Sequence, residues 1–351
     1  MAIDAPSMPL GDAAAVRPLR KKRPRPADAL FHGGVLGAVV ITMGALVWLL
    51  ATILAAGLSG LDWAFITDPV STNVETAGFN SAIRGSLVLM LITITVAIPV
   101  GFAAATYLEK FAALSRSQLE GNAYARQRRL REMESSGASG IGVTLHRLSV
   151  KWSFLWARVG PPINRGVEVN ISNLAAVPSI IYGLLGLALF VSFAGLQKSL
   201  LAGGLTLAVL VLPIIIIASR EAIRAVPISI EQGAMALGAT RWQAVSRQTI
   251  PAAFPGMLTG TILAMSRAIG EAAPLIVVGG VAFGTQTPSL NPLEANDTPL
   301  FAMPLQIFDW ADRPQQSYLD LAATGIIVLL IVLVLMNTVA IVLRNKFSRR
   351  W

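Results

Sequence analysis

The chain has 351 residues, of which 54% are hydrophobic and only 13% charged, a composition too apolar for an ordinary soluble domain. It predicts an all-α polytopic membrane protein. Cysteine is absent, which excludes disulfides, thiolate metal sites and cysteine nucleophiles. The HExxH, GxSxG and GxxxxGK[ST] patterns are also absent, so no metal, no cofactor and no ATP site is expected in this chain. We interpret the net charge of +9 as a topology signal rather than as a sign of nucleic-acid binding.

In chain order, a basic tail comes first and six apolar runs follow. Residues 1–31 predict a disordered cytoplasmic tail. The apolar run at 33–58 is longer than the h-region of a signal peptide, so it predicts a retained first span. Each of the other five runs is also long enough to cross about 30 Å of hydrocarbon as a helix. These runs are 85–108, 171–196, 200–219, 256–283 and 319–343.

The basic residues set the predicted topology. Of the 28 Lys and Arg, 24 fall on the side of the membrane that holds both termini, so the positive-inside rule places both termini in the cytoplasm of a protein of the cell (plasma or inner) membrane. After the amino-terminal tail, the chain is predicted to contain helices 1 and 2 at 32–110, a cytoplasmic insert at 111–164, helices 3 to 6 at 165–344 and a cytoplasmic tail at 345–351. The third of these segments contains a cytoplasmic loop at 220–255 and an extracytoplasmic loop at 284–318.

The insert at 111–164 is far longer than most connections between membrane helices. Its charged first half predicts a solvated helix, and residues 135–142 predict a flexible linker. The second half is basic and carries Trp152 and Trp156 at i, i+4. Two interpretations stay open: this stretch lies along the inner leaflet and meets anionic lipid, or it is a solvated tether.

The fifth apolar run carries two charges, Arg267 and Glu271, whose i, i+4 spacing puts both on one face of a helix. Ionisable groups at membrane depth are costly and usually face a partner helix or an aqueous path. Pro274 follows about one turn later and is expected to loosen the helix. The pair is therefore the first candidate site, and a purely structural ion pair is the alternative.

The loop at 220–255 predicts a short surface helix, a bend at Gly238 and an end at Pro251 and Pro255. Such a bent helix is suited to docking in a groove of a soluble partner, although an ordinary amphipathic connection has the same pattern. The loop resembles the EAA motif of ABC-importer permeases, in which Glu-Ala-Ala is followed by a glycine and a Leu-Pro end. Here the three places are taken by Gln232, Gly233 and Ala234, the glycine by Gly238 and the end by Ile250 and Pro251, while Glu231 sits one place early and Gln248 replaces an isoleucine.

Further stretches resemble the phosphate-specific transport permeases in particular. They are EVNISNLAAVPSIIYG at 168–183, SRAIGEAAP at 266–274, PLQIFD at 304–309 and RPQ at 313–315, the last two being similar to the external loop of the PstA-type subunit. The similarity covers roughly residues 33–351 apart from the insert.

This resemblance implies a type I ABC-importer permease fold and a transporter subunit rather than an enzyme. The implied cargo is inorganic phosphate, moved by alternating access. The implied partners are a second homologous permease subunit in a heterodimer, an ATPase dimer that uses the ATP, an extracytoplasmic phosphate-binding protein and membrane lipids. Alternatives are another oxyanion (sulfate, molybdate or phosphonate), an intramembrane phospholipid-modifying enzyme, or a scaffold subunit without a path.

In this context Arg267 is expected to contact the anion transiently, and Glu271 to hold Arg267 when no substrate is present. Ser179 and Tyr182 are candidates for path hydroxyls, unless Pro178 and Gly183 simply shape that helix. The residues expected to couple the loop to the ATPase are Glu231, Gln232, Ala234, Gly238, Ala239 and Pro251.

Overall fold

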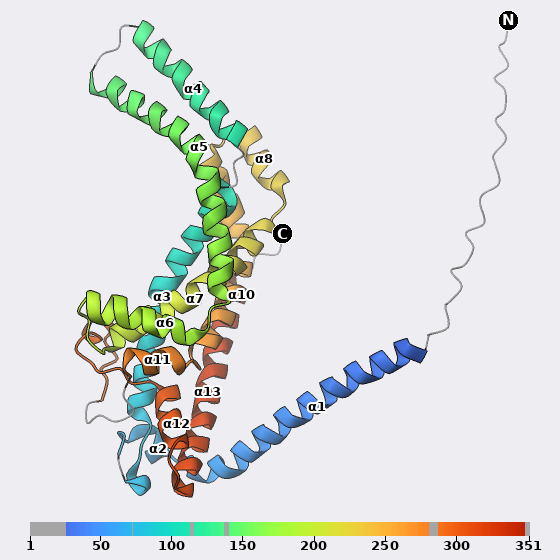
Figure 1. Ribbon diagram of the computed structural model, residues 1–351, viewed down its shortest axis with the longest axis vertical. Helices are drawn as coiled ribbons and strands as arrows, with labels where there is room; N and C mark the ends of the chain where they lie inside the picture. Colours follow the sequence, from blue (N-terminus) through green and yellow to red (C-terminus); the bar gives the residue numbers. More distant parts are fainter. Residues whose placement is uncertain (1–25, 72, 113–115, 137–139, 281–286, 348–351) are drawn as a thin grey trace, which may run out of the picture. The chain divides into compact units, whose positions relative to one another are not determined.

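Figure 1 shows the computed structural model, in which the described residues form helices and no named β-strand. The described residues are 26–71, 73–112, 116–136, 140–280 and 287–347, so most of the predicted amino-terminal tail and the last four residues lie outside them. The chain divides into two compact units, residues 1–52 and residues 53–351. The first contains most of α1 (Pro26–Gly57), and the second contains everything that is described below.

The described residues contain five helices that are long and apolar enough to cross a membrane, or six if one sharply bent pair counts as a single span. This confirms the predicted all-α, multi-span architecture. The long helices are α1, α3 (Asn80–Thr106), α7 (Leu200–Arg224), α10 (Ile250–Ala268) and α13 (Gln316–Phe347), and the bent pair is α5 (Ile141–Ala175) with α6 (Ser179–Gly186).

The shorter elements connect these spans. They are η1 (Leu58–Gly60), α2 (Trp63–Thr67), η2 (Val74–Thr76), η3 (Tyr107–Phe111), α4 (Arg116–Ser135), η4 (Leu187–Phe193), α8 (Ile228–Ala236), α9 (Arg241–Ala244), η5 (Val245–Thr249), α11 (Ala273–Val278), η6 (Pro292–Glu294) and α12 (Met303–Ala311). Of these, η3, η4 and η5 are π-helical turns, a local widening of the helix that is frequent at functional positions.

The third span differs from its prediction as one helix over 171–196. α5 ends at Ala175, and α6 begins at Ser179 at an angle of 110° to it. The cause is local: Pro178 disfavours the helical conformation of Val177 before it, and Pro178 is itself extended, with φ −55° and ψ 137°. The span is therefore broken inside the apolar run, where hydropathy alone shows no boundary.

The fifth span, predicted over 256–283, is also interrupted, and the break precedes the expected proline. α10 ends at Ala268 and α11 begins at Ala273, so Pro274 lies in the first turn of α11, where its missing N–H costs no hydrogen bond. Gly270 lies within the break. In Figure 1, α6 and α11 lie side by side and run across the direction of the long helices.

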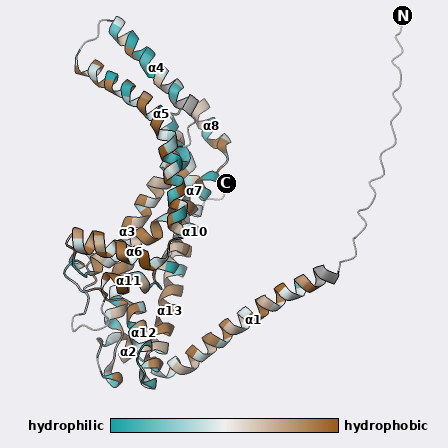
Figure 2. Cartoon of the chain, in the orientation of Figure 1, coloured by the Kyte–Doolittle hydropathy of each residue, from teal (hydrophilic) through white to brown (hydrophobic). Residues whose placement is uncertain are grey.

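The insert forms a helical hairpin of α4 and the first half of α5, which we call the α4–α5 hairpin. The helix predicted for its first half is present as α4, and the rings of Tyr124 and Phe154 meet edge to face at 5.0 Å across the hairpin. Arg147 also pairs with Glu134 at 2.8 Å. Figure 2 shows hydrophilic residues concentrated on α4 and hydrophobic residues on the spans.

The second half of the insert is not a separate surface helix, because α5 runs unbroken from Ile141 through the insert into the third span. A rise of 1.5 Å per residue puts Trp152 about 24 Å along the helix from Glu168, which pairs with the end of α7. That this stretch lies along the inner leaflet and meets anionic lipid stays a prediction. The tryptophans lie on a helix that continues the span.

Small residues bring the spans of the second unit close together. α3 packs against α7, where the hydroxyl of Thr93 donates to the carbonyl oxygen of Gly204 at 3.1 Å. At one end of the bundle Phe65, Phe79 and Trp310 stack with centroid distances of 5.4 to 6.0 Å. This cluster buries the inner face of α12, so that Phe308 is the large apolar side chain that α12 exposes.

Candidate functional site

The charged pair of the fifth span forms an ion pair at the carboxyl end of α10. Nε of Arg267 lies 3.1 Å from Oε1 of Glu271, although the helix ends between them. The side chain of Arg267 is 53% exposed and that of Glu271 is 20% exposed. The neighbouring Ser266 donates to Oδ1 of Asn337 at 2.7 Å, which fixes this end of α10 to α13. The guanidinium therefore lies on the outside of this subunit at a position that is held firmly.

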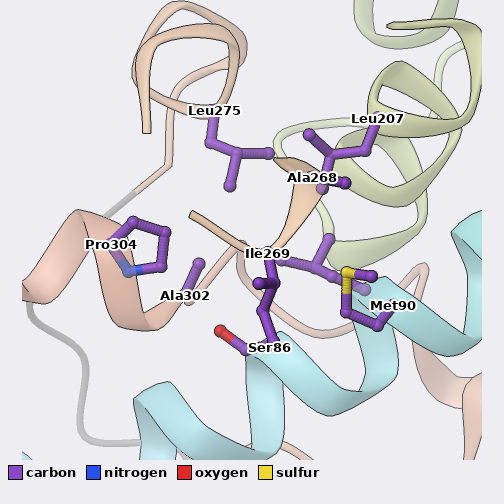
Figure 3. A pocket seen from close by; sticks show the side chains of 9 residues that line it. Ser86, Met90, Leu207, Ala268, Ile269, Leu275, Ala302 and Pro304 are labelled. Carbon is purple, nitrogen blue, oxygen red and sulfur yellow. The ribbon is translucent and has the colours of Figure 1, made fainter. Parts of the chain in front are cut away.

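Behind the pair, the subunit is closely packed. Figure 3 shows the small cavity beside Ala268 and Ile269, whose wall also includes the side chains of Met90 and Leu207. Its volume is about 10 Å³, which is at the lower limit for a single water. The hydroxyl of Ser86 on its wall already accepts from the N–H of Met303. The described residues beside Ala268 and Ile269 therefore leave no space in this cavity for anything larger than about one water.

The two candidates for path hydroxyls at the start of α6, Ser179 and Tyr182, differ in burial and in hydrogen bonding. Tyr182 is 5% exposed and its hydroxyl donates to the carbonyl oxygen of Leu174 at 2.7 Å. This bond spans the bend between α5 and α6, so Tyr182 stabilises the bend and its hydroxyl is already engaged. Ser179 is half-buried in the first turn of α6, and no hydrogen bond of its side chain is found in the described part of the chain.

The two broken spans meet at Gly183. A Cβ built at this position would lie 2.8 Å from both Cα and the carbonyl oxygen of Pro274, so only glycine permits this approach of α6 to α11. The contact joins the two sequence stretches that carry the resemblance, 168–183 and 266–274. It also fixes the start of α11, which follows Glu271 directly.

Gly183→Ala is expected to destabilise the protein by about 1 to 3 kcal/mol, because the methyl group overlaps backbone atoms that have no room to move. Gly166→Ala on α5 is the matched control, since a Cβ there meets nothing within 4 Å. The measurement is the thermal unfolding midpoint of the purified membrane protein. Equal midpoints for the two variants would contradict the close crossing.

The loop at 220–255 contains the predicted helix and tight bend, but the predicted end at Pro251 and Pro255 is wrong. α9, η5 and α10 follow one another without a break, with Pro251 in the first turn of α10 and Pro255 inside it. Membrane helices tolerate proline where neighbouring groups supply the missing hydrogen bonds. α8 ends at Ala236, and Gly238 has φ +89°, a conformation that favours glycine. Thr240 then caps α9 through a capping box with Gln243. The bend that was expected at Gly238 is thereby confirmed.

Glu231 is buried at 6% exposure and does not face outward. Its Oε2 lies 2.9 Å from Nζ of Lys110 in η3, and the two side chains are 8% and 12% exposed. Arg241 adds to this contact, because its guanidinium donates to the carbonyl oxygen of Lys110 and lies 3.9 Å from the other oxygen of Glu231. The loop is therefore clamped to the carboxyl end of the second span.

Aromatic contacts extend this clamp. The ring of Phe111 lies 6.0 Å from that of Trp242 and 5.7 Å from the guanidinium of Arg241. We call Lys110, Phe111, Glu231, Arg241 and Trp242 the loop clamp. In the sequence, Lys110 and Glu231 are 121 residues apart, and Lys110 had no signal beyond its contribution to the loop charge.

The other predicted coupling residues form the outer side of the loop. Gln232, Gly238 and Pro251 are exposed, and Ala234 and Ala239 are half-buried. Leu237 beside them is 92% exposed and Trp242 is 61% exposed. The loop therefore presents small residues and apolar side chains outward, while the carboxylate of Glu231 pairs inside the subunit with Lys110.

A second group of charges joins η3, α5 and α7 at the same end of the bundle. Glu109 accepts from Arg224 at 3.0 Å and from Arg220 at 3.4 Å, and Arg220 also pairs with Glu168 on α5. The side chain of Arg220 is only 13% exposed. Sequence analysis missed this group because its members come from three separate stretches, and its two arginines were counted only as topology charges.

The bundle of apolar spans, the solvent-exposed bent loop and the charged pair on an outer face define the transmembrane subunit of a transporter. A model of the family described as "Binding-protein-dependent transport system inner membrane component" matches residues 150–351, and the chain belongs to this family. Its members are transporter permease subunits and not enzymes, as predicted.

Comparison with individual relatives shows which members of this permease family the chain is similar to. The chain is 30% identical to the phosphate transport system permease protein PstA of Xylella fastidiosa, over 84% of this chain and 85% of that protein. It is 26% identical to PstA 1 of Mycobacterium tuberculosis, over 99% of this chain and 97% of that protein. It is 27% identical to the probable ABC transporter permease protein YqgI of Bacillus subtilis, over 79% of this chain and 76% of that protein. The chain therefore belongs with the PstA-type ABC-importer permeases, and the resemblance seen in its motifs is confirmed.

Proposed function

We propose that this chain is one of two permease subunits of an ATP-driven importer for inorganic phosphate, and that it forms half of the path by alternating access. The observation that carries the proposal is the Arg267–Glu271 pair, which lies on the outer face of α10 while the cavity behind it holds about 10 Å³. A half-exposed guanidinium at membrane depth is costly in lipid, so it faces a second subunit across the path. The second subunit is a homologous permease.

The cargo explains why an energy source is needed. Moving an anion of charge about −1.5 into an inside-negative cell costs about 3.5 kcal/mol at 100 mV. A hundredfold concentration gradient adds about 2.7 kcal/mol. A passive path would therefore leak phosphate outward. Since this chain has no phosphate-binding loop for ATP, an ATPase dimer supplies the energy.

We call Arg267 and Glu271 the membrane-depth pair, and each of the two residues has a role in this proposal. Arg267 offers a rigid fork of donors that suits phosphate oxygens. Glu271 holds Arg267 between substrates and prevents a fixed positive charge from retaining the anion. Ser179 remains a candidate for a path hydroxyl. Tyr182 is assigned to the bend instead, because its hydroxyl is used by Leu174.

The bent loop couples the ATPase to the path. The positive-inside rule puts this loop in the cytoplasm, with both termini. Its outer side, with Gln232, Ala234 and Ala239, docks on the ATPase. The loop clamp then passes the movement to α3, because Glu231 in α8 and Lys110 in η3 are held at 2.9 Å. Closure of the ATPase pair thereby moves a span as well as a loop.

The opposite end of the bundle receives the phosphate-binding protein. The segment 304–309 forms most of α12, whose inner face is buried, so the dock is made by its exposed side and by the preceding loop. Hydrogen bonds from Asn291 and Ser289 lower the pKa of Glu294 in that loop below its usual value. The loop therefore keeps its negative charge at neutral pH.

The function is tested by uptake of labelled phosphate into proteoliposomes that contain this chain, its partner permease, the ATPase and the binding protein. Uptake that requires ATP and is competed by unlabelled phosphate, but not by sulfate or molybdate, is the expected result. Uptake without ATP would contradict an ATP-driven importer. Competition by sulfate or molybdate at equal concentration would assign the other oxyanions.

A further inference from the structure

A cavity of about 340 Å³ lies at the loop end of the bundle, between η3, the second half of α5 and the carboxyl end of α7. It is separate from the membrane-depth pair and from the loop clamp. At about 30 Å³ per water, its volume corresponds to roughly ten waters. Its walls are formed by Leu108, Glu109, Ala112, Pro161, Asn164, Arg165, Glu168, Arg220 and Arg224.

The charges on its wall are unequal. Three guanidinium groups, from Arg165, Arg220 and Arg224, face two carboxylates, from Glu109 and Glu168. Arg220 and Arg224 share Glu109. Arg165 has no ion pair and no hydrogen bond of its side chain within the described part of the chain. The cavity therefore has one cationic group whose donors are available, beside a second one that is largely desolvated.

The two carboxylates are held differently. Glu109 is 16% exposed and accepts from both Arg220 and Arg224, so it fixes these two side chains in place. Glu168 is 48% exposed and pairs with Arg220 alone. A half-exposed carboxylate returns to water at little cost. An incoming anion therefore displaces Glu168 and leaves Glu109 in place.

We propose that this cavity binds a phosphate group, with Arg165 and Arg220 as the donors and Glu168 as an internal competitor. Guanidinium forks bind the oxygens of phosphate in pairs, and two forks from different helices suit a tetrahedral group. The apolar wall formed by Leu108, Ala112 and Pro161 accommodates the remainder of a larger molecule. The site does not depend on which oxyanion the transporter moves.

The phosphate group has two sources, an anionic lipid headgroup of the inner leaflet and free inorganic phosphate. Basic pockets between spans at the cytoplasmic side are typical sites for lipid headgroups. Free phosphate would reach the same donors from the cytoplasm, since the cavity is open to the surface. Both ligands would contact the same residues. They are distinguished by whether binding is observed with added inorganic phosphate or with an anionic lipid.

The experiment uses the assembled transporter without its binding protein and with Arg267→Gln, so that phosphate bound at membrane depth does not contribute. One arm titrates labelled inorganic phosphate. The other measures phosphatidylglycerol retained by the complex, by native mass spectrometry from nanodiscs that contain phosphatidylglycerol and phosphatidylcholine. Both arms compare three changes on α5: Arg165→Gln, Glu168→Gln and, as the control, Arg158→Gln, which removes an equal charge one heptad before Arg165 at a position that does not line the cavity.

Arg165→Gln is expected to weaken binding about tenfold, the effect of losing one charge-assisted contact. Glu168→Gln is expected to strengthen it, and Arg158→Gln to leave it unchanged. A general loss of structure would weaken binding in all three. This pattern in the phosphate arm identifies the free anion as the ligand, and in the lipid arm the headgroup. The proposal is overturned if neither arm shows it. Because binding is measured without transport, a failure of phosphate uptake does not affect this result.

Discussion

Lys110→Met is expected to lower phosphate uptake about tenfold while ATP hydrolysis continues. Removing one member of a buried ion pair costs about 3 to 5 kcal/mol, and of the described residues only Arg241, at 3.9 Å, then remains beside the carboxylate of Glu231. Glu231 then loses its partner at 2.9 Å, so α8 is held less firmly against the end of the second span. In the proposed mechanism the loop would still dock on the ATPase through its outer side. Its movement, however, does not reach α3.

The double variant Lys110→Met with Glu231→Met separates this role from simple stabilisation. It removes both charges, and it is expected to recover uptake to within about threefold of the parent, since a buried pair is often replaced by apolar residues without loss. Lys151→Met on the exposed side of α5 is the matched control. The measurement is phosphate taken up per ATP hydrolysed. An unchanged ratio in Lys110→Met, with both activities lowered in proportion, would show that the clamp only stabilises the subunit.

Arg267→Gln is expected to lower the maximal rate of uptake by about ten- to a hundredfold, because a hydrogen bond to a charged group contributes about 1.5 to 3 kcal/mol. Assembly should persist, since the side chain is half-exposed on an outer face and α10 is fixed to α13 by Ser266 and Asn337. Co-purification of the partner subunits checks this.

Glu271→Gln is expected to change the dissociation rate of phosphate in the opposite direction from Arg267→Gln. It frees Arg267 from its ion pair, so labelled phosphate should dissociate from the complex more slowly than from the parent, whereas Arg267→Gln should release it faster. Both variants lower the uptake rate, one by weak contact and the other by slow release. Arg147→Gln in the α4–α5 hairpin breaks another Arg–Glu pair and serves as the control. Normal uptake in both membrane-depth variants would assign the pair a purely structural role.

Hydropathy and charge were sufficient to predict the multi-span helical architecture, because burying backbone hydrogen bonds in lipid requires helices and these need about 20 apolar residues each. Local chemistry was sufficient for the bend at Gly238 and for the helix in the first half of the insert. The motifs at 168–183 and 266–274 also led to the correct family.

The break within the third span was not predictable from hydropathy, since the run at 171–196 remains apolar throughout. In the fifth run the two charges and Pro274 indicated a local disturbance, but not that the helix ends at Ala268. Pro178 and Gly270 mark the breaks only in retrospect, as membrane helices tolerate both residues when neighbours supply the missing hydrogen bonds. The direction of α6 depends on Gly183. A glycine is needed there because the helix contacts Pro274, which is 91 residues away in the sequence.

The sequence by itself determined the membrane class, the family and the two residues of the membrane-depth pair, because composition, motif spacing and a costly charge are all local properties. Only the tertiary structure decided that Glu231 faces Lys110, that Tyr182 holds a bend, and that three arginines and two glutamates line one cavity. These are contacts between stretches that are far apart in the chain. Their geometry is set by helix packing, which no single stretch specifies.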